Sequence, residues 1–274
     1  MSGRRGVLAS LGGLMLLVAI GLLAWGPLPI SAQAHRYADA RAWLGVPNGA
    51  NVLVNLPVFW LAVWGWCATR VSAWPRALRL PWQGFHLCVM AAALGAAMYH
   101  AAPGDMLMVA SRTFQACAFV LLALGLLAER VDPRFGSGAT CAAAAALTVL
   151  AGLVVALAGH QQGVADLRPL VLFEAIPVLL IPAAVLRVPG DQTSTSSWLV
   201  ALALYAGAKL FELTDAPIFN ATGWISGHTL MHLGCAAVVG WMAYRAAVSR
   251  SPDSVGTDAG GELSQRQTSL NTTG

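Results

Sequence analysis

The chain has 274 residues, of which 57% are hydrophobic and only 10% are charged, and its mean hydropathy is +0.66. Soluble domains carry about 25% charged residues, so this composition excludes an ordinary soluble protein and predicts an integral membrane protein. The formal net charge of +4 comes from arginines at the ends of apolar segments. It therefore reports membrane topology and argues against a nucleic-acid partner.

The first apolar run follows Arg4 and Arg5 and extends to about Trp25. A basic start, an apolar middle and the Ala-Gln-Ala sequence that ends at Ala34 are typical of a cleaved signal peptide. The run covers about 20 residues, however, which is enough to span a bilayer and longer than the apolar core of a signal peptide. For residues 1–34 we therefore expect a retained transmembrane helix and a linker, with a signal peptide as the alternative.

Seven further apolar segments follow, each long enough to cross a bilayer as a helix. Because a bilayer tolerates no unpaired backbone, we predict an all-α fold. The expected architecture is a polytopic membrane helix bundle, with a seven-helix core in residues 35–248 plus one N-terminal helix. Residues 249–274 are rich in Ser, Thr, Gly, Asp and Gln and are expected to form a disordered tail. The core segments lie at about 50–68, 83–102, 106–128, 138–159, 168–187, 196–212 and 227–246.

The arginines are distributed unevenly between the two sets of loops. Positive residues mark the cytoplasmic side of a membrane protein. The opposite loops hold only Arg36, Arg41 and Arg168. We therefore expect a protein of the cell membrane, with both termini cytoplasmic if the first helix is retained. The eleven arginines assigned to the cytoplasmic side are Arg4, Arg5, Arg70, Arg76, Arg79, Arg130, Arg134, Arg187, Arg245, Arg250 and Arg266.

The last apolar segment begins just after Ser226 and places His228 and His232 four residues apart. On a helix two such side chains share one face and lie about 6 Å apart along the axis, so both can bind one metal ion. His100, at the end of an earlier segment, is expected on the same side of the membrane and is the best third ligand. Three imidazoles with an open position are typical of a catalytic zinc site. The alternative is a set of hydrogen-bonded histidines within the bundle.

Other ionisable residues gather on the same side of the membrane. Buried charges persist there by pairing or by lining a wet cavity, so we expect a polar cavity open to the extracytoplasmic side, with the three histidines in its wall. Lys209 and Glu212 either form a local ion pair or, with Asp215, orient a metal-bound histidine. Glu174 has several candidate partners, between which the sequence does not choose. The residues concerned are Asp105, Arg112, His160, Glu174, Lys209, Glu212 and Asp215.

The remaining histidines and the cysteines are not expected to bind metal. His86 lies about 21 Å deeper than His100 along the same helix, so it cannot share a metal ion with it and is expected to be structural. His35 and His160 stand at segment ends, where we expect solvated side chains. The cysteines lie within apolar segments without a C-x-x-C pair, so we expect free, buried thiols. They are Cys67, Cys88, Cys117, Cys141 and Cys235.

Several short motifs occur in a fixed order along the chain. They are Asp39-Ala-Arg41-Ala-Trp43-Leu-Gly45-Val-Pro47-Asn48, Asn51-Val-Leu-Val-Asn55-Leu-Pro57, Tyr99-His100 followed by Pro103, the series Tyr205, Lys209, Glu212 and Asp215, and Ser226-Gly227-His228-Thr229 followed by His232. Together they resemble alkaline ceramidase-like (alkaline phytoceramidase-type) membrane proteins of the CREST superfamily of seven-helix membrane hydrolases. The resemblance spans about residues 35–246 and leaves the first helix outside the shared core.

This resemblance implies a zinc-dependent amidase of ceramide-type lipids, with a membrane lipid as substrate. The Zn²⁺ ligands implied are His100, His228 and His232. In the eukaryotic ceramidases a calcium site uses an acidic cluster before the first core helix. Asp39 and Asn48 fall in the corresponding stretch but do not reproduce that cluster, which argues against calcium.

Two positions depart from the pattern of the family. The family has a serine four residues before the first zinc histidine, where this chain has Ala96, and an aspartate eleven residues after it, where this chain has Ser111. Both family residues assist the activated water and the substrate amide. The catalytic residues of this chain are therefore unknown, and Asp105 and Asp215 are candidates for the missing acid or base.

The leading hypothesis is a membrane metallohydrolase that cleaves a lipid amide on the extracytoplasmic side. The alternative, favoured by Ala96 and Ser111, is a catalytically inactive or receptor-like relative that keeps the metal for structure or for lipid binding. Haem ligation ranks last, because haem needs opposed axial ligands whereas His228 and His232 share one helix face.

Overall fold

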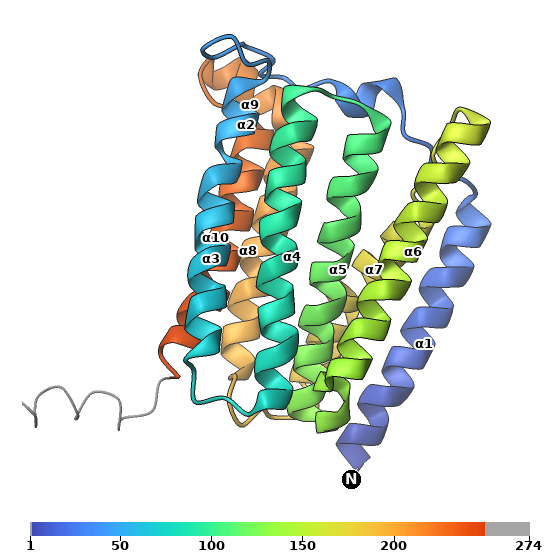
Figure 1. Cartoon of the computed structure of the whole chain (residues 1–274), viewed down its shortest axis with the longest axis vertical. Helices are drawn as coiled ribbons and strands as arrows, with labels where there is room; N and C mark the ends of the chain where they lie inside the picture. The colour runs from blue at the N-terminus through green and yellow to red at the C-terminus, as the bar shows by residue number, and fades with distance from the viewer. Residues whose placement is uncertain (1, 250–274) are drawn as a thin grey trace, which may run out of the picture.

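The computed structural model describes residues 2–249, and the predicted disordered tail lies outside them except for Ser249. The described chain is a bundle of long, roughly parallel and antiparallel helices (Figure 1). The long helices are α1 (Ser2–Trp25), α3 (Asn55–Arg70), α4 (Arg76–Ala101), α5 (Asp105–Arg130), α6 (Gly138–Gln162), α7 (Arg168–Val185), α8 (Thr195–Leu213) and α10 (Gly227–Ala247). The short elements are α2 (Gly49–Leu53), α9 (Asp215–Thr222) and the 3₁₀ turns η1 (Ala32–His35) and η2 (Pro133–Gly136).

Seven helical stretches in the described residues are long and apolar enough to cross a membrane, with α2 and α3 counted as one stretch. The predicted all-α membrane bundle is therefore confirmed. The helix α10 is not among the seven, although its 21 residues pack in the bundle beside α3 and α8. Its two histidines and Arg245 are polar residues in an otherwise apolar helix. The seven and α10 correspond to the eight apolar segments of the sequence.

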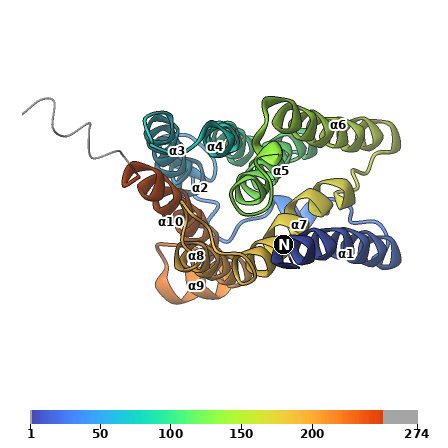
Figure 2. The ribbon, with the colours of Figure 1, turned by 90° about the horizontal axis from the view of Figure 1, so that it is seen from below.

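The helices α4 and α5 form the most extensive pairing of the bundle, and α3, α10 and α8 continue the packing on one side. The largest fully buried side chains include Trp82, Trp198, Leu126 and Met242. The first helix lies at the periphery of the bundle and packs mainly on α7, as the end-on view shows, and its Val7 joins the buried core (Figure 2). Only 6% of its apolar 18-residue stretch is buried, which fits a helix that faces lipid on most sides.

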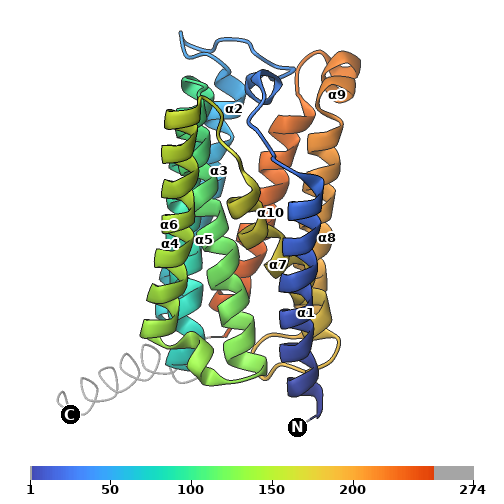
Figure 3. The same ribbon diagram turned by 90° about the vertical axis from the view of Figure 1, so that its right-hand side faces the viewer.

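Residues 26–48, called the linker below, cross one end of the bundle between α1 and α2 (Figure 3). One end of the linker pairs with the α6–α7 connection. There the amide of Leu167 donates to the carbonyl of Leu28 at 2.9 Å, and the amide of Leu28 donates to Oδ1 of Asp166 at 3.0 Å. At the other end, the amide of Ala38 donates to Oδ2 of Asp215 at 3.0 Å. The linker is therefore fixed to the helices at two separate points.

An ion pair between the exposed Arg41 and the buried Asp39 completes the second anchor of the linker. Arg41 Nε donates to Oδ1 of Asp39 at 2.8 Å, and Arg41 Nη2 donates both to Oδ2 of Asp39 and to the carbonyl of Trp224, each at 2.8 Å. The side chain of Asp39 is only 1% exposed. Hydrogen bonds from Arg41 hold the pKa of Asp39 below its ordinary value, so the aspartate stays ionised where it is buried.

Candidate metal centre

Three histidine side chains meet near the end of the bundle that the linker crosses. The Nε2 atoms of His100 and His232 lie 3.1 Å apart, and those of His232 and His228 lie 3.3 Å apart. His100 is 2% exposed, and the other two are partly buried. Among the described residues, this is the group of His, Cys, Asp and Glu side chains that could hold a metal ion, with ligand atoms all within 4.8 Å.

The geometry of the group fits a small tetrahedral metal ion. Zinc binds imidazole nitrogen at about 2.0–2.1 Å, and tetrahedral ligands at that distance stand about 3.3 Å from one another. The Nε2 separations of 3.1 Å (His100 to His232) and 3.3 Å (His232 to His228) agree with this value. Both of these contacts join Nε2 atoms, and the ligand nitrogens of all three rings lie within 4.8 Å of one another. The donor set could therefore hold a metal ion, and three imidazoles leave a fourth position for another ligand.

Local backbone structure explains how α10 presents its two histidines. Ser226 caps the helix, and its Oγ accepts from the amide of Thr229 at 3.1 Å. Gly227 follows at the point where α10 crosses the α8–α9 junction. A Cβ atom there would lie 2.7 Å from Cα of Asp215, so this close approach needs glycine. The amide of His228 then donates to Oδ1 of Asp215 at 2.7 Å.

His100 is held in place by contacts with the region around α2. It lies in the last turn of α4, and its carbonyl accepts from Nδ2 of Asn48 at 2.8 Å. Asn48 itself adopts a left-handed conformation, with φ of 51°, as the residue that caps α2. Asn51 links the same region to α10, because its Oδ1 accepts from Oγ1 of Thr229 at 3.0 Å. The resemblance motifs around Asn48 and Asn51 thus lie beside the histidine group.

Tyr37 of the linker lies directly against the histidine group. Its ring centroid is 4.8 Å from the ring centroids of both His100 and His228. Burial raises the pKa of the Tyr37 phenol, so its hydroxyl stays protonated and can act as a hydrogen-bond donor. The sequence analysis did not identify Tyr37. It precedes the resemblance motif by two residues and has no spacing relation to any histidine.

A second polar network surrounds Tyr99, next to His100. The ring nitrogens of His35 reach the Tyr99 hydroxyl at 3.0 Å and Oδ1 of Asp105 at 2.8 Å. The Tyr99 hydroxyl donates to the carbonyl of Ala34 at 2.9 Å. The expectation that His35 is solvated is therefore wrong, because the linker folds back and brings it to α4 and α5. The expectation holds for His160, which is exposed.

The two candidate acids occupy different places. A cavity extends from the histidine group into the bundle, and Asp215 is among the residues that line it. Asp105 does not line this cavity and instead bonds to His35. Both carboxylate oxygens of Asp215 accept from backbone amides, those of Ala38 and His228. Asp215 therefore orients the start of α10 through its backbone, and the contact does not involve an imidazole ring.

The other ionisable residues on this side form pairs. Lys209 Nζ lies 2.6 Å from Oε2 of Glu212, which is the local ion pair that the sequence suggested as one alternative. Arg112 Nη1 lies 3.4 Å from Oε2 of Glu174. The structure thus selects Arg112 among the candidate partners of Glu174. In the described residues, no side-chain hydrogen bond joins Lys209 or Glu212 to a ring of the histidine group.

A cavity of about 600 Å³ extends from the histidine group into the bundle. Near the histidines its wall is polar, with Tyr37, Lys209, Glu212 and Asp215. Its far wall is apolar and includes Phe85, which precedes His100 by 15 residues on α4 and so lies about 22 Å from it along the helix axis. Linker residues 29–31, 33 and 34 also line the cavity, and they cover the end that holds the histidines.

The two positions that depart from the family pattern both line this cavity. Ala96 contributes only a methyl group. The hydroxyl of Ser111 donates to the carbonyl of Ala92 at 3.2 Å, which directs it toward α4.

Residues predicted to have no metal role lie outside the histidine group. His86 is fully buried, and neither of its ring nitrogens has a hydrogen-bond partner among the described residues. All five cysteines are free, as expected. The expectation that they are buried holds fully only for Cys117, because Cys88, Cys141 and Cys235 are partly buried and Cys67 is exposed.

Comparison with models of protein families, with curated proteins and with solved structures finds no match for this chain. The fold and the site define a polytopic membrane protein with seven candidate membrane-spanning helices in its described residues. A buried group of three histidines within this protein could hold a metal ion.

Proposed function

We propose that this protein is a zinc-dependent membrane hydrolase that cleaves a lipid amide of the ceramide type. One observation carries the proposal: three Nε2 atoms converge at the polar end of a cavity whose other end is apolar. A polar reaction centre beside a long apolar pocket suits an amide that joins a polar headgroup to a hydrocarbon chain. The resemblance of the motifs around His100, His228 and His232 to alkaline ceramidases supports the same activity.

Different residues of the cavity would bind the metal, the polar headgroup and the acyl chain. His100, His228 and His232 would hold the zinc ion, which activates water and polarises a carbonyl group. Tyr37 would border the substrate at the reaction centre, because its ring lies against two of these histidines. The acyl chain would occupy the apolar part of the cavity, whose depth of about 22 Å exceeds half of the ~30 Å hydrocarbon core of a bilayer.

We propose that the histidine end of the bundle faces the extracytoplasmic side. The arginine bias of the loops supports this orientation. The start of α1 and the end of α10 lie at the opposite end of the bundle from the linker, so residues 2 and 249 share one side (Figures 1 and 3). The linker covers the histidine end, which favours substrate access sideways from the lipid.

The test combines metal analysis with a lipid assay on the full chain, purified without chelator. We expect about one zinc per chain and hydrolysis of N-acylated sphingoid lipids. His232→Ala should lose both, because it removes one of three ligands. His160→Ala is the matched control, since His160 is exposed at the end of α6 and should keep both. Protein that takes up no zinc on reconstitution would overturn the metal assignment. Lipidomics of membranes with and without the protein would identify the lipid.

A second candidate function is lipid binding without catalysis, in a receptor-like relative that keeps the metal for structure. Ala96 and Ser111 favour it, because the first lacks a polar group and the second bonds to the backbone of α4. This function predicts zinc and bound lipid in the purified protein. It also predicts that N-acylated sphingoid and ornithine-type lipids stay uncleaved.

A further inference from the structure

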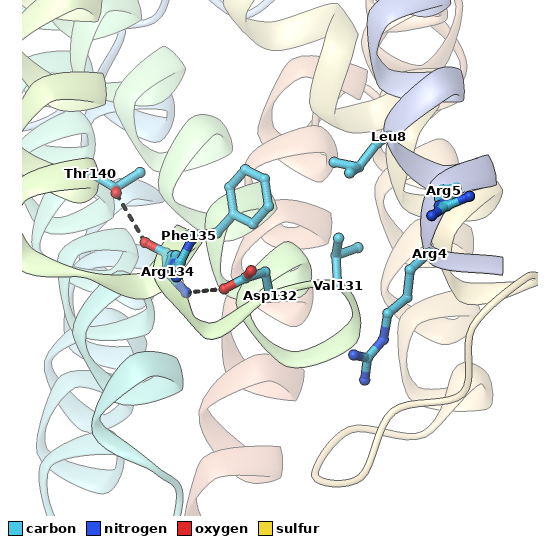
Figure 4. Close-up of a pocket in the computed structure, with 8 residues that line it drawn as sticks. All are labelled: Arg4, Arg5, Leu8, Val131, Asp132, Arg134, Phe135 and Thr140. Carbon is cyan, nitrogen blue, oxygen red and sulfur yellow. Dashed lines mark hydrogen bonds between the residues drawn. The ribbon is translucent and has the colours of Figure 1, made fainter. Parts of the chain in front are cut away.

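A second cavity, of about 430 Å³, lies at the opposite end of the bundle from the histidines. Figure 4 shows its two walls. Arg4, Arg5 and Leu8 come from the first turns of α1, while Asp132, Arg134 and Phe135 come from the connection between α5 and α6. Basic groups and apolar side chains therefore line one space between two parts of the chain that are far apart in sequence.

The electrostatics of this cavity favour an anion. Three arginines against one aspartate leave a formal charge of plus two. Oδ1 of Asp132 already accepts from the backbone amide of Arg134 at 2.8 Å, as the residue that caps η2. Among the described residues, none of the three arginines forms an ion pair with a carboxylate. Their positive charge is therefore available to a ligand.

The level of the cavity indicates where such a ligand would come from. Candidate membrane spans begin at Arg4 in α1 and at Gly138 in α6, and another ends at Arg130 in α5. The cavity thus lies at the boundary of the apolar part of the bundle, where lipid headgroups meet the protein. Leu8 is 42% exposed beside it, and α1 packs mainly on α7, so the cavity wall is accessible from the lipid.

We propose that this cavity binds the phosphate group of an anionic phospholipid. The phosphate would lie between Arg4 and Arg5 of α1 and Arg134 of the α5–α6 connection, and the glycerol end of the acyl chains would contact Leu8 and Phe135. Basic pockets between transmembrane helices on the cytoplasmic side are a known mode of lipid headgroup recognition. The bound lipid would connect α1 to the core on the side where the two share little protein contact. This site is independent of the histidine group.

Native mass spectrometry of the full chain in mild detergent tests the proposal. The protein would be titrated with phosphatidylglycerol, with phosphatidylcholine of the same acyl chains, and with inorganic phosphate. We expect tighter retention of phosphatidylglycerol than of either competitor. The variants R4Q, R5Q and R134Q should each weaken it about fivefold, since one arginine near a headgroup has an effect of that size. R76Q is the matched control, because Arg76 is exposed at the start of α4 on the same side of the bundle, and should bind normally.

Three results would overturn the proposal. Equal retention of the two phospholipids would show that charge is not recognised. Equal binding of inorganic phosphate and phosphatidylglycerol would identify a soluble anion as the ligand in place of a lipid. An equal loss in R76Q and the three variants would show a diffuse effect of surface charge. Thermal unfolding in detergent reports on the folded bundle in every variant, and this control does not depend on the histidine group.

Discussion

Oδ1 of Asp215 accepts a hydrogen bond from the backbone amide of His228 at 2.7 Å, and Oδ2 accepts one from the amide of Ala38. One side chain thus joins α9, the first turn of α10 and the linker. The carboxylate also satisfies an amide at the start of α10 that has no partner within the helix. This arrangement favours a positioning role for Asp215 beside the candidate metal centre, and its role as a proton-transfer group stays a prediction.

Asp215→Asn tests that role. An asparagine offers one acceptor and one donor where two backbone amides need acceptors, so the start of α10 should shift. We expect zinc affinity to fall about 10–100-fold, which is typical when a residue that orients metal ligands is replaced. The measurement is competition with a zinc chelator. Glu212→Gln is the control, since it breaks the pair with Lys209 but contacts neither amide. Unchanged zinc affinity with lost hydrolysis would instead make Asp215 a proton-transfer group.

The double substitution Ala96→Ser with Ser111→Asp separates the two proposed functions. Both positions line the main cavity, so the new groups would face a bound substrate. A positioned acid or base typically contributes ~10²–10⁴-fold, and turnover of N-acylated sphingoid lipid should rise accordingly if these positions limit it. We expect a low but measurable wild-type rate. A large gain from no activity would mark the natural protein as non-enzymatic, and a small gain would show that another residue already transfers the proton.

Asp39→Asn should loosen the linker and make stability depend less on pH. Because Arg41 lowers the folded-state pKa of Asp39, its contribution to stability is complete above the unfolded-state pKa of about 3.9 and is lost as pH falls through the folded value. We expect a loss of about 1 kcal/mol or less at neutral pH, because the Arg41 side chain is exposed and solvent screens its pair with Asp39. Thermal unfolding in detergent at neutral and strongly acidic pH would measure it. The difference between wild type and variant should shrink in acid, and a constant difference would contradict the assignment.

Cysteine labelling of intact cells tests the orientation of the bundle. In a background that carries Cys67→Ala, because Cys67 is exposed, single cysteines would replace the exposed residues Pro103 and Asn220. We expect both to react with an impermeant thiol reagent. A cysteine at Ser137, exposed at the opposite end of the bundle, should stay unlabelled until the cells are opened. The reverse pattern would invert the proposed topology.

Much of this architecture follows from local sequence. Apolar length and arginine placement predict the helices to within a few residues, except for α4, which begins at Arg76 rather than near residue 83. The first turns of that helix place Leu78 and Trp82 in the buried core, so the helix extends beyond the apolar run. The meeting of His100 with His228 and His232 was also predictable, because helix direction places them at one end of the bundle.

The contacts of the linker could not be predicted in the same way. Tyr37, His35 and Asp39 belong to a stretch without periodicity, and their partners lie on α4, α5 and the region beyond α9. Hydrogen bonds such as the one from His35 to Asp105 join residues 70 positions apart. No spacing rule relates such residues. The sequence also gave no sign that Asp215 would bond to backbone amides, since a carboxylate in a polar cavity is equally suited to proton transfer.

The linker connects the first helix to the wall of the cavity that holds the histidines. Linker residues 29–31, 33 and 34 form part of the cavity wall, and the Ala-Gln-Ala sequence considered as a cleavage site ends within that wall. A peptidase that cut after Ala34 would remove this portion of the wall together with its anchor at Asp166. The histidines would then open to the aqueous phase. Proteolytic processing of the amino terminus and opening of the cavity beside the histidines would therefore be a single event.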